Sequence, residues 1–162
     1  FRPNVDAVLW FGQEVLPLIR AEIPGVRFKV VGRNPHPRLR HLGEESDITL
    51  TGYVDDVRPY IAQAGVYVVP LRVGGGTRLK ILEAMSMGKA VVSTSLGCEG
   101  IEVTPDQDLV IADEPHVFAK SVVELIENRK RRRKLGLAAR QLVESEHDWR
   151  QITPLLEQVY EG

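Results

Sequence analysis

Short runs of largely apolar, mostly β-branched residues alternate along the chain with longer segments of helical pattern. The apolar runs lie at residues 26–31, 48–51, 66–70, 89–94 and 109–112. Short, largely apolar runs of this kind predict strands buried on both faces. Helices are predicted at residues 5–22, 38–43, 55–64, 77–87, 115–128, 129–145 and 149–160. This alternation predicts an α/β fold: a Rossmann-like, doubly wound parallel sheet with helices on both faces.

Length and composition predict one globular domain. The 162 residues are enough for one domain with a proper core and too few for two ordinary domains. Because the first predicted element is a helix, we expect the first strand and its following loop to precede residue 1. A net charge of −1 gives no field toward nucleic acid, so we expect no nucleic-acid partner. No apolar run approaches the roughly 20 residues that span a bilayer, and we expect a cytoplasmic location.

The glycine-rich stretch at residues 74–94 is the strongest functional signal. It reads GGGTRLKILEAMSMGKAVVST, in which three glycines precede a helix that Thr77 is expected to cap. Bare glycine amides leading into a helix N-terminus favour an anion. Glu83, further along that helix, is placed to accept hydrogen bonds from hydroxyl groups attached to the anion. The pattern favours a ligand that combines phosphate and sugar; a flexible loop beside a surface Lys80–Glu83 pair is the alternative.

Ligands of open parallel sheets bind beyond the carboxyl ends of the strands. Four segments of this chain follow strands in that way: residues 32–34, 52–54, 73–77 and 94–100. We expect them to share one edge of the sheet. Glu99 is expected to touch the base or the sugar of a ligand there, whereas Cys98 is expected to be a packing residue.

Residues 83–92, EAMSMGKAVV, resemble the signature of the retaining, GT-B-fold glycosyltransferases of family 4, also called group 1. VVG at 30–32, TGYV at 51–54 and VVPL at 68–71 resemble the strand ends of that family, and Trp149 resembles the aromatic residue of its closing segment. The resemblance covers essentially the whole chain. It implies that residues 1–162 form the C-terminal half of a GT-B fold, a single nucleotide-sugar-binding domain without the acceptor-binding N-terminal domain.

The resemblance also implies roles for individual residues. Glu83 would hold the ribose hydroxyls, and Tyr53 and Val54 would frame the base. The remaining implied donor contacts are Gly32, Gly75, Gly76, Thr77 and Leu79. Arg78 and Lys80 are the candidate catalytic residues, because with the helix amides they would stabilise charge on the leaving phosphate.

The glycine loop departs from the common family pattern at one position. A first glutamate would stand eight residues before Glu83, where this chain has Gly75. A carboxylate expected against the donor sugar is therefore missing, and we expect Arg78 and Lys80 to compensate. The four histidines of the chain are scattered along the sequence, so we expect no metal and no cofactor.

The implied reaction is retaining transfer of a hexosyl group from a nucleotide-sugar to a glycan or lipid-linked acceptor, as in polysaccharide biosynthesis. The acceptor would bind through the N-terminal domain, so the isolated domain is expected to bind donor without catalysing transfer. Two alternatives stay open: a nucleotide-sugar epimerase of GT-B architecture, and a non-catalytic nucleotide-binding α/β module. The basic run at residues 129–134, RKRRRK, indicates either a solvated helix face or a peripheral contact with an anionic membrane.

Overall fold

The computed structural model of the chain describes residues 2–33, 36–76 and 78–146. The strands are β1 (Phe28–Val30), β2 (Ile48–Leu50), β3 (Tyr67–Val69), β4 (Val91–Ser93) and β5 (Val110–Ile111). The helical elements are α1 (Arg2–Trp10), η1 (Phe11–Val15), α2 (Leu16–Glu22), η2 (Pro37–Leu39), α3 (Arg40–Gly43), α4 (Arg58–Gln63), α5 (Leu79–Ser86), η3 (Leu96–Cys98), α6 (Pro115–Glu127) and α7 (Arg129–Glu146). The predicted alternation of strands and helices is confirmed, with shorter strands than predicted. The helix predicted at residues 149–160 lies outside the described residues.

All strand pairs are parallel, and they form two separate hydrogen-bonded groups. β1 pairs with β2 in the register Phe28↔Ile48 to Val30↔Leu50. The second group has the order β3-β4-β5, in which Val68 faces Val92 and Val92 faces Val110. Within the described residues, β1 and β3 therefore each have a strand partner on one side only.

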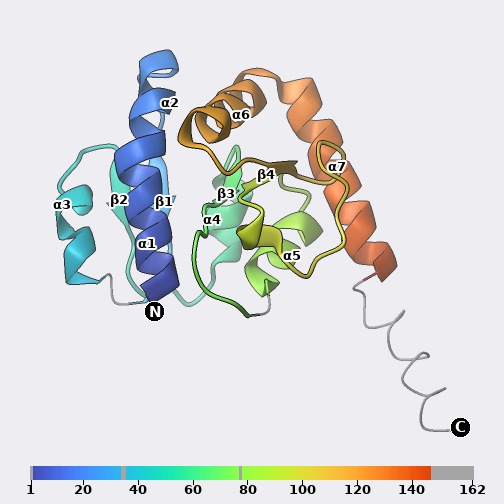
Figure 1. Cartoon of the computed structure of the whole chain (residues 1–162), viewed down its shortest axis with the longest axis horizontal. Coiled ribbons are helices and arrows are strands. Elements are labelled where there is room, and N and C mark those ends of the chain that lie inside the picture. Colours follow the sequence, from blue (N-terminus) through green and yellow to red (C-terminus); the bar gives the residue numbers. More distant parts are fainter. Residues whose placement is uncertain (1, 34–35, 77, 147–162) are drawn as a thin grey trace, which may run out of the picture.

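Helices cover both faces of this parallel arrangement (Figure 1). Two neighbouring residues of β4 belong to different cores, one on each face of the sheet, because successive side chains of a strand point to opposite faces. Val92 belongs to the core formed with the N-terminal helix and α6. Val91 belongs to the core formed with α4, α5 and α7. The doubly wound, two-faced architecture predicted from the sequence is thus confirmed.

The N-terminal helical segment joins the two strand groups through aromatic contacts. The Phe11 ring lies 4.5 Å from the Phe28 ring of β1, measured between centroids. The Trp10 and Phe11 rings lie 5.6 Å and 5.8 Å from Phe118 of α6, both edge-on. Residues 2–22 stay helical, and the π-helix η1 directly precedes α2, in whose first turn Pro17 lies. Proline has no N–H to donate, and a wider turn accommodates the lost bond.

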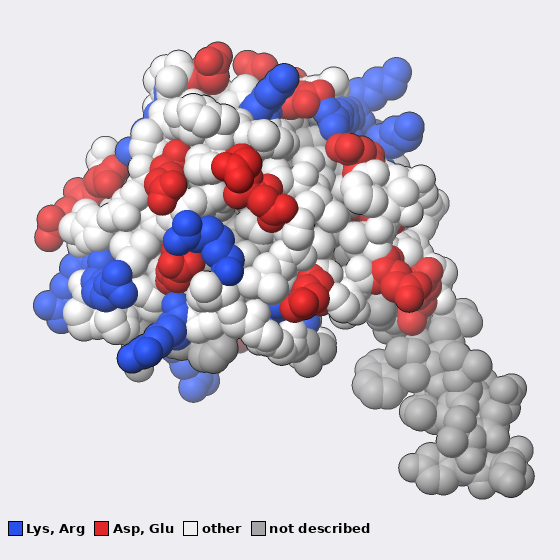
Figure 2. Space-filling view, viewed as in Figure 1, with Lys and Arg blue, Asp and Glu red and all other residues white. Residues whose placement is uncertain are grey.

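Charged side chains of both signs are spread over the face of the molecule shown in Figure 2. The basic run at residues 129–134 opens α7, and two of its members have structural partners. Arg132 donates to the carbonyls of Leu125 and Ile126 at the end of α6, at 2.8 and 2.7 Å. Arg131 pairs with Glu124 and with Asp106. The other four cations of the run are exposed, and no described helix is long and apolar enough to cross a membrane.

A close glycine contact fixes α7 against the helix that follows the glycine-rich loop. A Cβ atom built on Gly136 would lie 2.1 Å from the carbonyl oxygen of Gly88, just after α5. Ala139, one turn further along α7, is fully buried in the same core as Ala84 and Met85 of α5. The approach of α7 to α5 therefore requires a residue without a side chain at position 136.

We expect Gly136→Ala to lower the free energy of unfolding by about 1–3 kcal/mol, because the added methyl group overlaps backbone that cannot move cheaply. Helix propensity alone predicts the opposite sign, since alanine is about 1 kcal/mol better than glycine in a helix. Urea denaturation followed by circular dichroism measures the change. Gly65→Ala is the control, because a Cβ there meets nothing within 4 Å. Equal stability of the Gly136 variant and the wild type would refute the packing argument.

Candidate functional site

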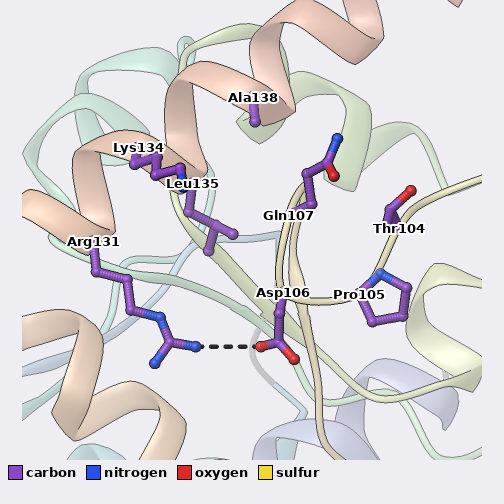
Figure 3. Close-up of a pocket in the computed structure, with 8 residues that line it drawn as sticks. All are labelled: Thr104, Pro105, Asp106, Gln107, Arg131, Lys134, Leu135 and Ala138. Atoms are coloured by element: carbon purple, nitrogen blue, oxygen red, sulfur yellow. Dashed lines mark hydrogen bonds and ion pairs between the residues drawn. The ribbon is translucent and has the colours of Figure 1, made fainter.

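One cavity of the domain lies away from the site predicted from the sequence. It has a volume of about 520 Å3 and lies between α7 and the loop before β5 (Figure 3). Arg131, one of its charged lining residues, is paired with Asp106 at 3.2 Å. Because this loop leads into the amino end of β5, the cavity lies at the edge opposite the strand carboxyl ends. The Arg131–Asp106 pair is a structural contact, and the predicted site lies at the carboxyl ends of the strands.

The glycine loop after β3 adopts a backbone that glycine permits. Gly74 and Gly76 have φ angles of 93° and 117°, in the left-handed region. Gly74 packs on the start of α1, where a Cβ would lie 2.6 Å from the Pro3 side chain. Gly75 and Gly76 are exposed, as is Leu79, the first residue of α5, at 66%. The loop therefore presents open backbone at the entrance to α5.

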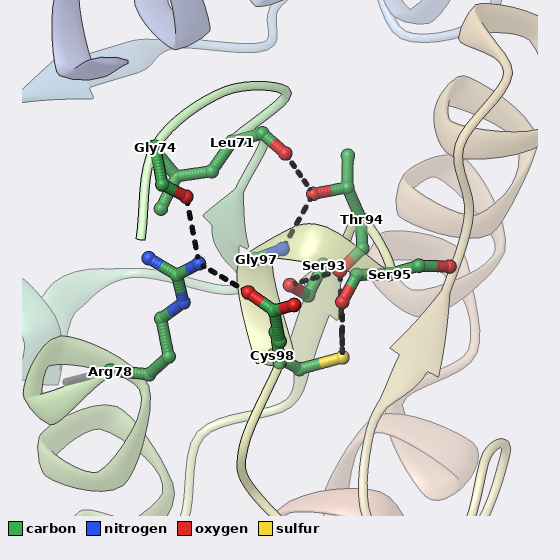
Figure 4. Close-up of polar contacts among 9 residues, drawn as sticks. Leu71, Gly74, Arg78, Ser93, Thr94, Ser95, Gly97 and Cys98 are labelled. Carbon is green, nitrogen blue, oxygen red and sulfur yellow. Dashed lines mark hydrogen bonds and ion pairs between the residues drawn. The ribbon is translucent and has the colours of Figure 1, made fainter. Parts of the chain in front are cut away.

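Arg78 occupies the N-cap position of α5, and its side chain is turned inward. The predicted cap, Thr77, lies outside the described residues. Arg78 is only 7% exposed, and its Nη2 donates to the Gly74 carbonyl at 3.2 Å. The same atom lies 3.5 Å from a carboxylate oxygen of Glu99 (Figure 4). The buried Nε has no hydrogen-bond partner among the described residues.

An unpartnered buried N–H is uncommon in folded proteins and calls for an explanation. Here it belongs to a guanidinium that is always charged and that lies beneath the glycine loop. The sequence predicts that Arg78 stabilises charge on a leaving phosphate, and the structure places Arg78 as a buried cation behind the loop. It also brings Glu99 to that cation, a pairing that no local sequence pattern announces.

Lys80 lies at the junction of α5 and α1. Its Nζ donates to the side-chain oxygen of Asn4 at 3.2 Å. The pKa of Lys80 is lowered, first by partial desolvation of the ammonium group and second by the charge of Arg78, although the residue keeps exposed surface overall. The surface pair of Lys80 with Glu83 that the sequence allowed is absent from the described structure. Lys80 instead connects the glycine-loop helix to the N-terminal helix.

Glu83 is half-buried in the second turn of α5, and its charge acts on residues of β3 and α4. Burial raises the pKa of Tyr67 in β3, and the charge of Glu83 adds to the shift. The Glu83 charge also adds, after Asp56, to the raised pKa of Arg58 at the start of α4. No described residue forms a hydrogen bond with its carboxylate, which is free to accept one from a ligand.

A cationic side chain and an aromatic side chain lie close together at the ends of β1 and β2. Tyr53 is 59% exposed, and the Arg33 guanidinium carbon lies 4.7 Å from the centre of its ring. The two residues come from adjacent strand ends, since Val30 and Leu50 are register partners. Gly32 is exposed and Val54 half-buried beside them. Arg33 was not singled out from the sequence, although its place directly after a strand-end glycine was a usable signal.

A buried hydroxyl joins the loops that follow β3 and β4. The Thr94 hydroxyl donates to the Leu71 carbonyl and accepts from the Gly97 N–H, the latter at 3.0 Å (Figure 4). Ser93, which is fully buried, donates to the Val69 carbonyl at 3.3 Å. These bonds hold the Glu99 loop against the glycine loop. The sequence showed only that a Ser-Thr pair ends the fourth apolar run.

The described residues contain no group of three or more His, Cys, Asp or Glu side chains that could hold a metal ion. The charged groups at the strand carboxyl ends include the cations Arg33, Arg78 and Lys80 and the carboxylates Glu83 and Glu99. Such groups can bind a phosphorylated and hydroxylated ligand.

Comparison with known proteins decides the family. The sequence profile described as Glycosyl transferases group 1 matches residues 1–128. The chain belongs to this family. A GDP-mannose-dependent alpha-(1-6)-phosphatidylinositol monomannoside mannosyltransferase of Mycobacterium tuberculosis is 30% identical over 149 residues, which are 83% of this chain and 39% of that protein. This group 1 chain spans between 30% and 42% of the length of the curated relatives that it matches.

Solved structures agree on the fold. Sucrose-phosphate synthase from Thermosynechococcus elongatus has a TM-score of 0.77 at 23% identity, covering 93% of this chain and 41% of that chain. The C-terminal domain of the group 1 protein LpcC from Francisella tularensis has a TM-score of 0.62 at 15% identity, covering 85% of this chain and 94% of that domain. The group 1 domain thus has the fold of the C-terminal half of a GT-B glycosyltransferase.

We expect Thr94→Val to lower the free energy of unfolding by about 1–3 kcal/mol, because the buried Leu71 carbonyl and Gly97 N–H both lose a partner. Urea denaturation is the measurement. Thr49→Val makes the same chemical change at an exposed position of β2 whose hydroxyl has no partner among the described residues. If both variants unfold at the same urea concentration, the Thr94 hydroxyl does not join the two loops.

Cys98 is expected to be unreactive in the folded domain. It is 5% exposed, and its Sγ lies 3.5 Å from the carbonyls of Thr94 and Ser95. Burial raises the pKa of the thiol, which lowers the thiolate fraction at neutral pH. Iodoacetamide should modify native protein roughly tenfold or more slowly than protein in urea, because reaction requires local opening. Equal rates in both states would place the thiol at the surface.

Proposed function

We propose that this chain is the donor-binding domain of a retaining glycosyltransferase that moves a hexosyl group from a nucleoside diphosphate sugar to a glycan or lipid-linked acceptor. The observation that carries the proposal is the buried Arg78, whose Nε has no described partner beneath an open glycine loop. Open amides at a helix entrance, backed by a buried cation, favour a diphosphate.

The diphosphate would lie against Gly75, Gly76 and the first turn of α5. Negative charge grows on its oxygens as the bond to the sugar breaks, and fixed positive groups stabilise that charge. Lys80 supplies an ammonium beside the loop, held near Asn4 at 3.2 Å. Arg78 supplies positive charge from beneath the loop, together with an Nε–H group that has no described partner. Both positive groups are already in place before the bond to the sugar breaks, so neither side chain has to rearrange during the reaction.

The ribose and the base would extend from the diphosphate toward α4 and β2. Glu83 has a carboxylate without a described partner, and such a group can accept bonds from two neighbouring ribose hydroxyls. Its charge is felt at Arg58, directly after the loop that carries Tyr53 and Val54. The base would therefore lie along that loop, with Gly32 at its border.

Glu99 is proposed to face the transferred sugar. Gly75 stands where the family pattern has a glutamate, so the loop itself offers no carboxylate at that position. Glu99 is exposed, and its contact with Arg78 at 3.5 Å keeps a carboxylate beside the loop. A carboxylate from the β4 loop would thus replace one from the β3 loop.

The domain is proposed to include a central strand from the segment upstream of residue 1. β1 and β3 each lack a partner on one side within the described residues. In the doubly wound order 3-2-1-4-5-6, the first strand lies between the second and the fourth. β1 and β3 fit the second and fourth positions, which supports one domain over residues 1–162 that the upstream strand completes.

The acceptor is proposed to bind through an N-terminal domain, so this domain alone would bind donor without transferring it. The mycobacterial relative is named as acting on a phosphatidylinositol monomannoside, which supports a lipid-linked acceptor. A cytoplasmic location with a peripheral membrane contact stays a prediction. It rests on Arg129, Lys130, Arg133 and Lys134, the four exposed cations of the basic run.

We expect Glu83→Ala to weaken nucleoside diphosphate binding at least about tenfold, because hydrogen bonds to a charged group contribute about 1.5–3 kcal/mol each. Isothermal titration calorimetry of the 162-residue chain with UDP, GDP and ADP is the measurement. Glu22→Ala removes an exposed carboxylate at the far end of α2 and serves as the control. Unchanged affinity for every nucleotide in the Glu83 variant would contradict the proposed ribose contact.

A further inference from the structure

We infer that Arg33 and Tyr53 select a purine base, and that Arg33 is the specificity-determining residue for the nucleotide. The inference rests on the proposed function, because it concerns the base subsite of the same donor site. The observation behind it is the stack of the Arg33 guanidinium over the Tyr53 ring at 4.7 Å, at the carboxyl ends of β1 and β2.

In this stack, one face of the Arg33 guanidinium lies over the Tyr53 ring and the other face is free. Tyr53 is 59% exposed, so its ring contributes little to the core and is open to solvent. The guanidinium covers one face of this ring and is itself exposed. Among the described residues, no carboxylate lies within ion-pair distance of Arg33, so the outer face of its guanidinium is not committed to a protein partner.

A planar guanidinium with a free face stacks on flat aromatic rings. Arginine does this better than lysine, because its charge is delocalised over a plane and is weakly hydrated. A nucleobase laid on that face would form the third layer over Tyr53. A purine has two fused rings and covers the guanidinium more completely than the single ring of a pyrimidine, and stacking strength follows that overlap.

The position of the stack fits a base. Loops at the carboxyl ends of parallel strands hold the ligands of this fold class. The loop that carries Tyr53 leads to Arg58, and the charge of Glu83 contributes to the raised pKa of Arg58. A ribose held by Glu83 would therefore leave its base beside Tyr53, and the guanidinium would stand on the same side of the loop.

The test compares four variants of the 162-residue chain by calorimetric titration with GDP, ADP, UDP and CDP. Arg33→Ala removes the platform, and Arg33→Lys keeps the charge while removing the plane. Arg38→Ala is the matched control, since Arg38 is exposed and its side chain has no described partner. Glu83→Ala reports on nucleotide binding as a whole.

We expect the wild type to bind the purine nucleotides several-fold more tightly than UDP and CDP. Arg33→Ala and Arg33→Lys should both weaken GDP and ADP about tenfold and the pyrimidine nucleotides by less than about threefold, since base stacking carries the difference. Arg38→Ala should match the wild type.

Three outcomes would overturn the inference. They are a wild-type preference for UDP or CDP, a parallel loss of all four nucleotides in Arg33→Ala, and full retention of purine binding in Arg33→Lys. The last two would mean that Arg33 acts as a charge for phosphate. Each leaves the proposed function standing while Glu83→Ala still weakens binding of the nucleotides at least about tenfold. A wild type that binds none of the four nucleotides would remove both.

Discussion

The packing of the N-terminal helix across both strand groups is the interaction on which the rest of the domain depends. β1 and β3 share no hydrogen bond among the described residues, so main-chain pairing does not join the two halves. Phe11 contacts Phe28 on one side, while Phe11 and Trp10 contact Phe118 on the other. Aromatic side chains bury large apolar areas, and they keep the four strand ends of the site in one arrangement.

The same helix also reaches the site. Its first turn carries Pro3, which Gly74 packs against, and Asn4, which holds Lys80. Arg72, in the loop after β3, pairs with Asp6 at 2.9 Å. The glycine loop is thus positioned by α1 from one side and by the Thr94 hydrogen bonds from the other. A loop rich in glycine would otherwise have too much conformational freedom to present its amides in one direction.

The sequence predicted the alternation of strands and helices along the chain, because a strand buried on both faces, such as β4, leaves a short apolar run. It also located the glycine loop and Glu83, since both depend on neighbours in the chain. Contacts between distant loops left no such trace. Nothing near Arg78 announced that it would turn inward to Glu99, and nothing near Tyr53 announced Arg33. The inward turn follows from the tight loop geometry around Gly74, which only three-dimensional packing determines.

The two separate strand groups have a consequence for how the domain opens. Parallel strands that share a hydrogen-bonded ladder tend to open together, whereas units joined only by side chains can open separately. Without the proposed central strand between β1 and β3, the β1–β2 half, which carries Tyr53, can fluctuate apart from the β3–β4–β5 half, which carries the glycine loop. A ligand that touches both halves would couple these two units and raise the cooperativity of the whole domain.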